Sequence, residues 1–148
     1  MRTIPPIAGL LLLLSTSGAF AQESGGGMPR TPSPEGAEVY IQSPEDGAEV
    51  TSPFTVRFGL RGMGVAPAGI TADNTGHHHL LIDVETPPPP NLPLPSSDNV
   101  RHFGLGQTET ELDLPPGEHT LQLVLGDALH IPHDPPVRSE VITITVVE

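Results

Sequence analysis

Short segments that alternate apolar with polar residues, each bounded by glycine or proline, constrain this fold more than any other feature. The chain has 19 prolines and 16 glycines among its 148 residues. After the first 21 residues, its apolar residues show no helical periodicity. Alternation with a period of two places every second side chain on the same face of a strand. The pattern therefore predicts an all-β domain built from short strands.

The alternation is clearest at residues 54–60 and 119–125, and shorter segments carry it at residues 39–41, 78–84, 109–114 and 141–147. About seven short strands, with a turn signal every ten or so residues, are typical of an antiparallel, immunoglobulin-like β-sandwich. Aromatic residues are scarce, with four Phe, one Tyr and no Trp, so the core is predicted to be aliphatic. We expect one such domain over residues 37–148.

Residues 1–21 have the pattern of a cleaved signal peptide. Arg2 supplies a positive start, an apolar run follows at residues 7–14, and residues 19–21 (AFA) fit the small-x-small cleavage pattern. The apolar run is much shorter than the roughly 20 residues of a membrane-spanning helix. Residues 22–36 are rich in Gly, Pro and Ser and have little to bury, which predicts a disordered linker. We therefore expect a periplasmic or secreted protein that is not inserted in a membrane after signal cleavage.

Composition excludes several classes of function. The chain has no cysteine, so disulfides, thiolate ligands and a cysteine nucleophile are excluded. Its formal net charge of −12, with no lysine, argues against nucleic-acid binding. The sequence contains neither a GxSxG motif nor a glycine-rich loop that precedes a helix. We expect a protein that is not an enzyme and whose partner is a metal ion or another envelope protein.

Three consecutive histidines precede an apolar run in GHHHLLID, residues 76–83. If this segment is a strand, alternation points His78 toward the core and places His77 and His79 together on the opposite face. In an immunoglobulin-like sandwich, the loop between the second and third strands lies at the same end as the loop between the last two. Here these loops are residues 61–76 and residues 126–136. The residues that could converge at this end are His77, His79, His130, His133 and Met63.

Neutral imidazole is a good ligand for Cu²⁺ and Zn²⁺. A metal site is therefore one hypothesis, with His77, His79 and His130 as first-choice ligands and His133 and Met63 as second. The other hypothesis is a structural or protein-interaction module of the cell envelope that binds no metal. In that case the loop histidines only make hydrogen bonds, and the proline-rich residues 87–95 form part of a contact rim. By the same topology, His119 should lie far from the others, and the sequence does not place His102.

Three stretches together resemble a known family: GHHHLLID, then RHFGLGQTETELDLPPGEHTLQLVLGD, then ALHIPHDPPVRSEVITITV. They are similar to a bacterial family of exported proteins known as domain of unknown function 4399, over roughly residues 39–147. The resemblance implies a small periplasmic domain and brings no established activity or catalytic residue. Separately, SPEDGAEV, FTVRFGL and PPGEHTLQLVLGD are similar to strands of bacterial immunoglobulin-like modules, which supports the fold only.

Overall fold

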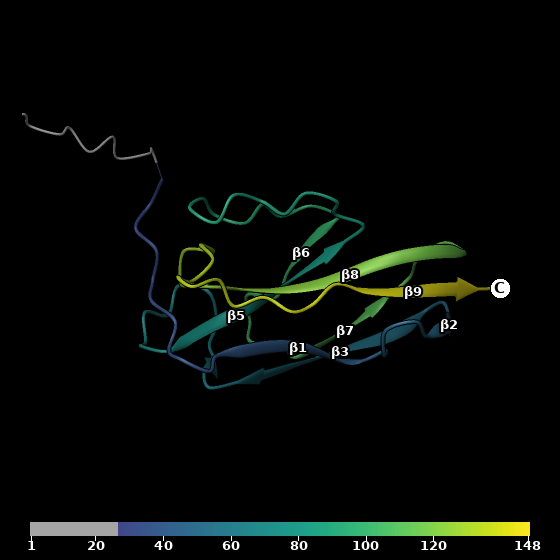
Figure 1. The fold of residues 1–148 in the computed structure, drawn as a ribbon, viewed down its shortest axis with the longest axis horizontal. Coiled ribbons are helices and arrows are strands. Elements are labelled where there is room, and N and C mark those ends of the chain that lie inside the picture. The colour runs from purple at the N-terminus through teal and green to yellow at the C-terminus, as the bar shows by residue number, and fades with distance from the viewer. Residues whose placement is uncertain (1–26) are drawn as a thin grey trace, which may run out of the picture.

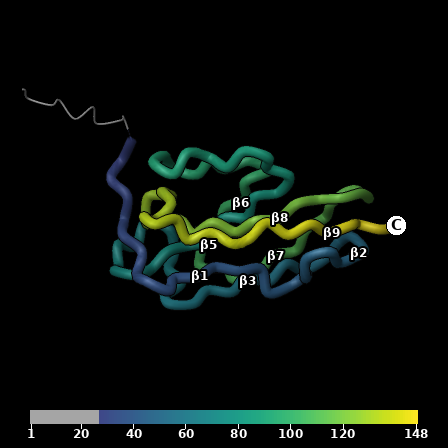
Figure 2. The backbone as a smooth tube through the Cα atoms, viewed as in Figure 1, coloured from purple at the N-terminus to yellow at the C-terminus, as the bar shows by residue number. Residues whose placement is uncertain are grey.

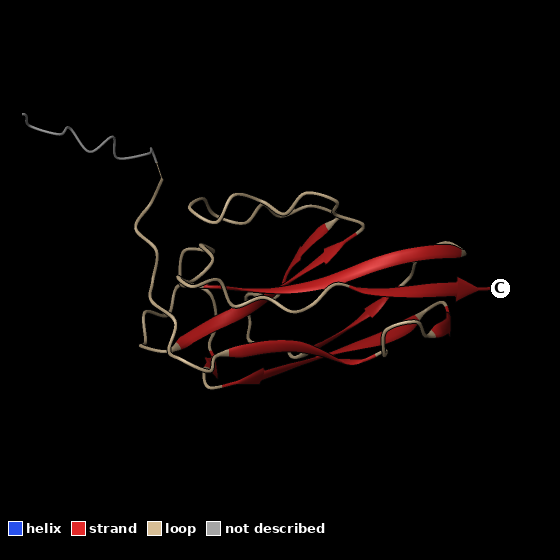
Figure 3. Cartoon of the chain, in the orientation of Figure 1, coloured by secondary structure: helices blue, strands red, loops and turns tan. Residues whose placement is uncertain are grey.

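The computed structural model describes residues 27–148, which form two β-sheets without any helix (Figures 1 and 3). The predicted signal peptide, residues 1–21, lies outside the described residues. Within the described part, there is accordingly no helix that could cross a membrane.

The smaller sheet has three strands in the order β1-β3-β7. These strands are β1 (Glu38–Ser43), β3 (Phe54–Arg61) and β7 (Glu109–Leu112). Both of its pairings are antiparallel. All three strands lie within or next to segments that the alternation predicts.

The larger sheet has the order β2-β9-β8-β5-β4, and β6 also pairs with β5. Its strands are β2 (Glu49–Thr51), β4 (Gly64–Val65), β5 (Thr75–Ile82), β6 (Val100–His102), β8 (Gly117–Gly126) and β9 (Ile142–Val147). The β2–β9 and β4–β5 pairs are parallel and the other pairs are antiparallel. The predicted immunoglobulin-like sandwich is confirmed. The described residues contain nine strands instead of about seven, because β2, β4 and β6 have only two or three residues and show no alternation.

The core between the two sheets is mainly aliphatic, as the composition predicts. Its fully buried members come from both sheets: Val56, Leu80, Leu112, Leu121, Leu123, Leu125 and Ile144. Its aromatic members are Phe54, Phe58 and Phe103. The rings of Phe58 and Phe103 pack against each other with centroids 4.9 Å apart. Burial of these side chains is the main favourable contribution to folding.

The outer face of the larger sheet is also covered near its middle. The proline-rich segment that follows β5 lies over this face, seen in Figure 1 as the teal loop above β5 and β8. A second apolar cluster forms there from Leu81, Leu94, Val100 and Val124. Every residue of β5 after Thr75 is buried. His78 faces the main core, and the outer-facing His77 and His79 pack against each other and against His102 and His130.

Of the linker predicted for residues 22–36, residues 22–26 lie outside the described residues, whereas residues 31–33 pair with the folded domain. The amide of Ser33 donates to the Asp134 carbonyl at 3.0 Å, and the amide of Asp134 donates to the Thr31 carbonyl at 2.9 Å. The segment thus runs beside the loop between β8 and β9 (Figure 2). The amino-acid composition does not predict this pairing, because the segment is held by backbone hydrogen bonds and polar contacts rather than by burial of apolar side chains.

His119 lies at the opposite end of β8 from the histidine run, as the topology predicts. Its Nδ1 is 2.7 Å from an Asp83 carboxylate oxygen, and its Nε2 is 2.9 Å from the Pro115 carbonyl oxygen. Both partners are acceptors, and an imidazole can donate from both nitrogens only when it is protonated. Burial acts to lower the pKa of His119, but the hydrogen bonds to Asp83 and Pro115 outweigh it and raise the pKa above 6.5.

We expect His119 to stabilise the fold at acidic pH and to lose this effect as the pH rises. A histidine whose pKa is raised on folding stabilises the folded state fully at pH values below its pKa in the unfolded chain, about 6.5. This stabilisation disappears once the pH exceeds its pKa in the folded protein. The free energy of unfolding of His119→Gln should therefore fall furthest below that of the natural protein under acidic conditions. Denaturant unfolding across this pH range measures the difference. Asp83→Asn should remove the same pH dependence, and a constant difference at all pH values would contradict the assignment.

Candidate metal centre

Four histidine side chains converge at one end of the larger sheet. His77 and His79 come from β5, His102 from β6, and His130 from the loop after β8. One ring nitrogen of each lies within 4.8 Å of the corresponding nitrogen of every other. The closest contact is between His77 Nε2 and His130 Nδ1, at 3.0 Å. The ring centroids of the neighbouring pairs are 4.7–5.9 Å apart.

Strand register produces this convergence. His77 and His79 are two residues apart on β5 and therefore project from the same face. His79 is the direct partner of His102 on the antiparallel strand β6, and directly opposed side chains in such a pair are close neighbours. His77 is opposite Gly126 at the end of β8. The chain leaves β8 at that point and returns His130 to the same face.

Two glycines leave room for the imidazole rings. A Cβ at Gly126 would lie 2.7 Å from His79 Cε1, and a Cβ at Gly104 would lie 2.3 Å from His102 Cε1. Both distances are shorter than van der Waals contact, so any other residue would force the ring or the backbone to move. Glycine at these two positions is therefore part of what shapes the cluster.

A tight turn at residues 127–131 sets the position of His130. His130 has a φ of 66°, a left-handed conformation that costs a non-glycine residue about 1–3 kcal/mol. Its amide donates to the Asp127 carbonyl at 2.9 Å. One oxygen of the Asp127 carboxylate accepts the amides of Leu129 at 2.9 Å and Ile131 at 3.0 Å. These bonds hold the strained backbone in place and keep the ring of His130 against that of His77.

The cluster favours neutral imidazoles. Burial, together with the neighbouring His130 and His102, lowers the pKa of His77 to about 4. Burial, together with His77, His102 and His130, lowers the pKa of His79 to about 3. The pKa of His102 is lowered by burial and then by His130. Neutral imidazoles have a lone pair free to bind a metal ion.

Several ring nitrogens in the cluster have no hydrogen-bond partner within the described part of the chain. His77 and His79 are each 1 % exposed. Both nitrogens of His79 and the Nδ1 of His77 are buried without a partner. Burying a polar group without a hydrogen bond costs about 1–3 kcal/mol, so these atoms indicate a place where a ligand would be favourable.

The structure separates the residues that the sequence predicts as ligands. His77, His79 and His130 are brought together as predicted. His133 is fully buried elsewhere, with Nε2 3.1 Å from the Thr75 carbonyl oxygen and Nδ1 3.4 Å from the Leu125 carbonyl oxygen. Met63 packs at the edge of the main core. Neither His133 nor Met63 belongs to the cluster.

His102 is the member that sequence reasoning misses. It lies on a three-residue strand that follows a long proline-rich loop, and so short a strand gives no periodic signal. The sequence offers only a weak indication of its position, namely that Val100 and His102 are two residues apart and so share a face if they form a strand. In the structure this face turns Val100 toward Leu81 and His102 toward His79. His78 points inward as predicted and contacts the Phe58 ring, with centroids 5.2 Å apart.

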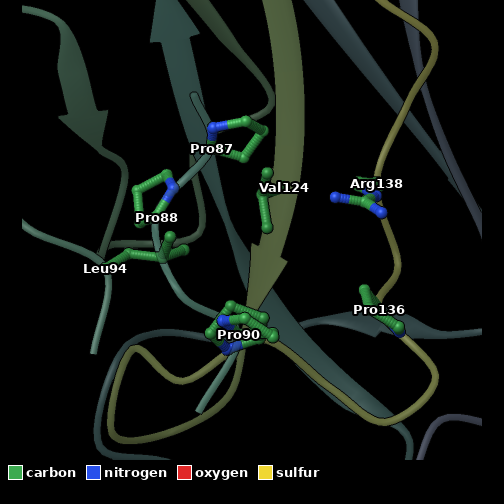
Figure 4. A pocket seen from close by; sticks show the side chains of 8 residues that line it. Pro87, Pro88, Pro90, Leu94, Val124, Pro136 and Arg138 are labelled. Atoms are coloured by element: carbon green, nitrogen blue, oxygen red, sulfur yellow. The ribbon is translucent and has the colours of Figure 1, made fainter. Parts of the chain in front are cut away.

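An apolar groove lies between the proline-rich segment and the loop that joins β8 and β9 (Figure 4). Arg138 is its only charged residue, and its other lining residues are apolar: Pro87, Pro88, Pro90, Leu94, Val124, Pro132 and Pro136. None of the four clustered histidines lines it. The groove therefore lacks the metal-ligating side chains that the histidine cluster brings together.

Four imidazoles, without thiolate or carboxylate, form a donor set that suits Zn²⁺ or Cu²⁺. In a tetrahedral zinc site each nitrogen lies about 2.0–2.1 Å from the ion, so ligating nitrogens lie roughly 3.3 Å apart. The His77–His130 separation of 3.0 Å is already close to this value. The other separations are at most 4.8 Å and would close with modest ring rotations, which the exposed His102 is free to make.

Comparison with known protein families gives a match over most of the domain. The model of a family described as "Domain of unknown function (DUF4399)" matches residues 56–147, a range that contains all four histidines of the cluster. No curated protein and no solved structure matches the chain.

We expect the metal-free protein to lose stability steeply as the pH falls below about 6.5. His77 and His78 have pKa values of about 4, and that of His79 is about 3, in each case mainly because of burial. Below pH 6.5 these histidines are protonated in the unfolded chain but stay neutral in the folded protein. Each of them therefore lowers the free energy of unfolding by up to about 1.4 kcal/mol for each unit that the pH falls. Denaturant unfolding in the presence of chelator at several pH values measures the slope.

His78→Leu provides the matched comparison, because His78 lies in the apolar core outside the cluster. This variant should lose stability less steeply than the natural protein, by about 1.4 kcal/mol per pH unit between pH 6 and 5. Equal slopes for the two proteins would show that His78 is protonated in the folded state.

Proposed function

The chain belongs to the family described as domain of unknown function (DUF4399), and from its histidine cluster we propose that it binds a Cu²⁺ or Zn²⁺ ion. His77, His79, His102 and His130 are the ligands. The observation that carries the proposal is the convergence of four imidazoles from three separate segments, with nitrogens within 4.8 Å of one another.

Other histidines of this chain show what a structural role looks like. Both nitrogens of His119 face protein acceptors, and so do both nitrogens of His133. His79 has no such partner and instead faces three other imidazoles. The ring nitrogens of His78 also lack hydrogen-bond partners, but this ring packs against Phe58 rather than against the clustered imidazoles. A missing partner is therefore not enough to identify a ligand, and the convergence of the rings distinguishes the four.

The donor set also supports a role in binding rather than catalysis. Four protein ligands complete a tetrahedral shell, whereas catalytic zinc sites keep one position for water or substrate. His77 and His79 are buried, while His102 is exposed and His130 is partly buried. This asymmetry suits a site that takes up and releases its ion through the exposed side. We propose storage, delivery or sensing of the ion, in the periplasm or outside the cell, as the role of the protein.

Calorimetric titration of the tag-free, metal-free protein with Cu²⁺ and with Zn²⁺ tests the proposal. We expect one ion per chain. His102→Gln should weaken binding more than the roughly 10–100-fold that loss of an outer hydrogen-bond partner costs, because it removes a ligand. His119→Gln is the matched control and should bind like the natural protein. Binding no tighter than that of a short histidine peptide would contradict the proposal.

A second variant tests the geometry of the site without removing a ligand. Gly104→Ala places a methyl group where His102 now lies, with 2.3 Å from the new Cβ to Cε1. We expect the ring to be displaced and the metal affinity to fall, while thermal stability of the metal-free protein changes little, because Gly104 lies in an irregular segment. Gly106→Ala is unsuitable as a control because of its φ of 83°. Gly64→Ala is the matched control, because its new Cβ would meet only Thr75 Cγ2, at an ordinary contact distance of 3.5 Å. Unchanged affinity in Gly104→Ala would exclude His102 from the ligand set.

A further inference from the structure

The turn that presents His130 is held from outside by the N-terminal segment. Residues 31–33 pair with the backbone around Asp134 through two amide hydrogen bonds of 2.9 and 3.0 Å. In Figure 2 this segment descends beside the loop between β8 and β9. It lies about a hundred residues away in sequence and outside the range of the family match, which begins at residue 56.

Thr31 connects this segment directly to the turn of His130. Its hydroxyl donates to one oxygen of the Asp127 carboxylate at 2.7 Å. The other oxygen of the same carboxylate accepts the amides of Leu129 and Ile131 on either side of His130. Asp127 is only 5 % exposed, so water offers little replacement for these bonds. The orientation of the carboxylate, and with it the turn, therefore depends in part on Thr31.

Arg30 holds the continuation of the same loop. Its Nε donates to the Pro132 carbonyl at 3.1 Å, and its guanidinium also donates to the His133 carbonyl. It forms an ion pair with Asp134 at 3.1 Å. The Arg30 side chain is 18 % exposed, against 55 % and 65 % for Arg57 and Arg61 in their ion pairs. The Arg30 side chain is thus largely buried against the loop, whereas the side chains of Arg57 and Arg61 lie on the surface.

We propose that Thr31 and Arg30 are positioning residues of the metal site, which act on His130 through Asp127 and the loop that follows it. The inference rests on the proposed metal binding. Neither residue contacts a ligand nitrogen. They keep the left-handed turn formed before the ion arrives, so that binding does not have to order it. Partners hydrogen-bonded directly to a ligand commonly contribute 10–100-fold to metal affinity, and Thr31, which acts one bond further out, is expected at the lower end of this range.

The experiment compares Cu²⁺ affinity and release in three threonine variants. Thr31→Val removes the hydroxyl and keeps the shape, Thr31→Ser retains the hydroxyl, and Thr110→Val changes a threonine on β7, far from the site in the other sheet. We expect Thr31→Val to bind about tenfold more weakly and to release the ion faster to a chelator. Thr31→Ser and Thr110→Val should match the natural protein. Arg30→Ala should also weaken binding, and Arg61→Ala should not.

Electron paramagnetic resonance of the Cu²⁺-loaded proteins separates positioning from general stability. Thr31→Val should show an altered copper signal, because His130 is no longer held, and Thr31→Ser should restore it. If Thr31→Val binds and releases Cu²⁺ as the natural protein does, with the same signal, the inference is wrong and the proposed function stands. If the natural protein itself binds no ion, the proposed function fails first.

Discussion

Burying three consecutive histidines in the middle of a sheet is the constraint on which the rest of this structure depends. β5 has β8 on one side and β6 and β4 on the other, and apolar clusters cover both of its faces. A charged imidazole in such a place would lose its hydration without gaining a counter-ion. The three rings must therefore remain neutral, and each needs either an apolar neighbour, a hydrogen bond or a ligand. His78 has the first, while His77 and His79 face two further imidazoles.

The segments around β5 divide the four imidazoles into three fixed rings and one exposed ring. His77 and His79 are immobilised by strand pairing and by burial, and His130 is held by the turn that Asp127 stabilises. His102 lies at the exposed end of a short strand. An ion could therefore meet three preorganised nitrogens first and be enclosed by His102. Preorganisation of part of a site reduces the ordering cost of binding, and the exposed ring provides a route for release.

Sequence patterns predict the parts of this arrangement that depend on local periodicity. The long strands and the inward direction of His78 follow from alternation, and the meeting of His77, His79 and His130 follows from the order of the loops in a sandwich. Contacts between distant segments escape such reasoning. The pairing of β6 with β5, which brings in His102, crosses a proline-rich loop and depends on register that no pattern encodes. The order of residues 30–33 likewise depends on carbonyl groups and a carboxylate about a hundred residues away. His133 was misplaced because its loop bends inward, where its ring reaches the carbonyls of Thr75 and Leu125.

The same buried nitrogens would connect the proposed metal binding to the stability of the fold. Each unsatisfied polar group costs about 1–3 kcal/mol, and the cluster contains three such atoms in His77 and His79. An ion that occupies the cluster would recover part of this cost and would bind the folded state in preference to the unfolded chain. At a free ion concentration one hundred times the dissociation constant, that preference is worth about 2.7 kcal/mol, similar to the cost of one or two of the unsatisfied nitrogens.

The chain has no disulfide to hold it together, and its net charge of −12 favours the approach of cations. A site of this kind would make the stability of the domain follow the supply of the ion.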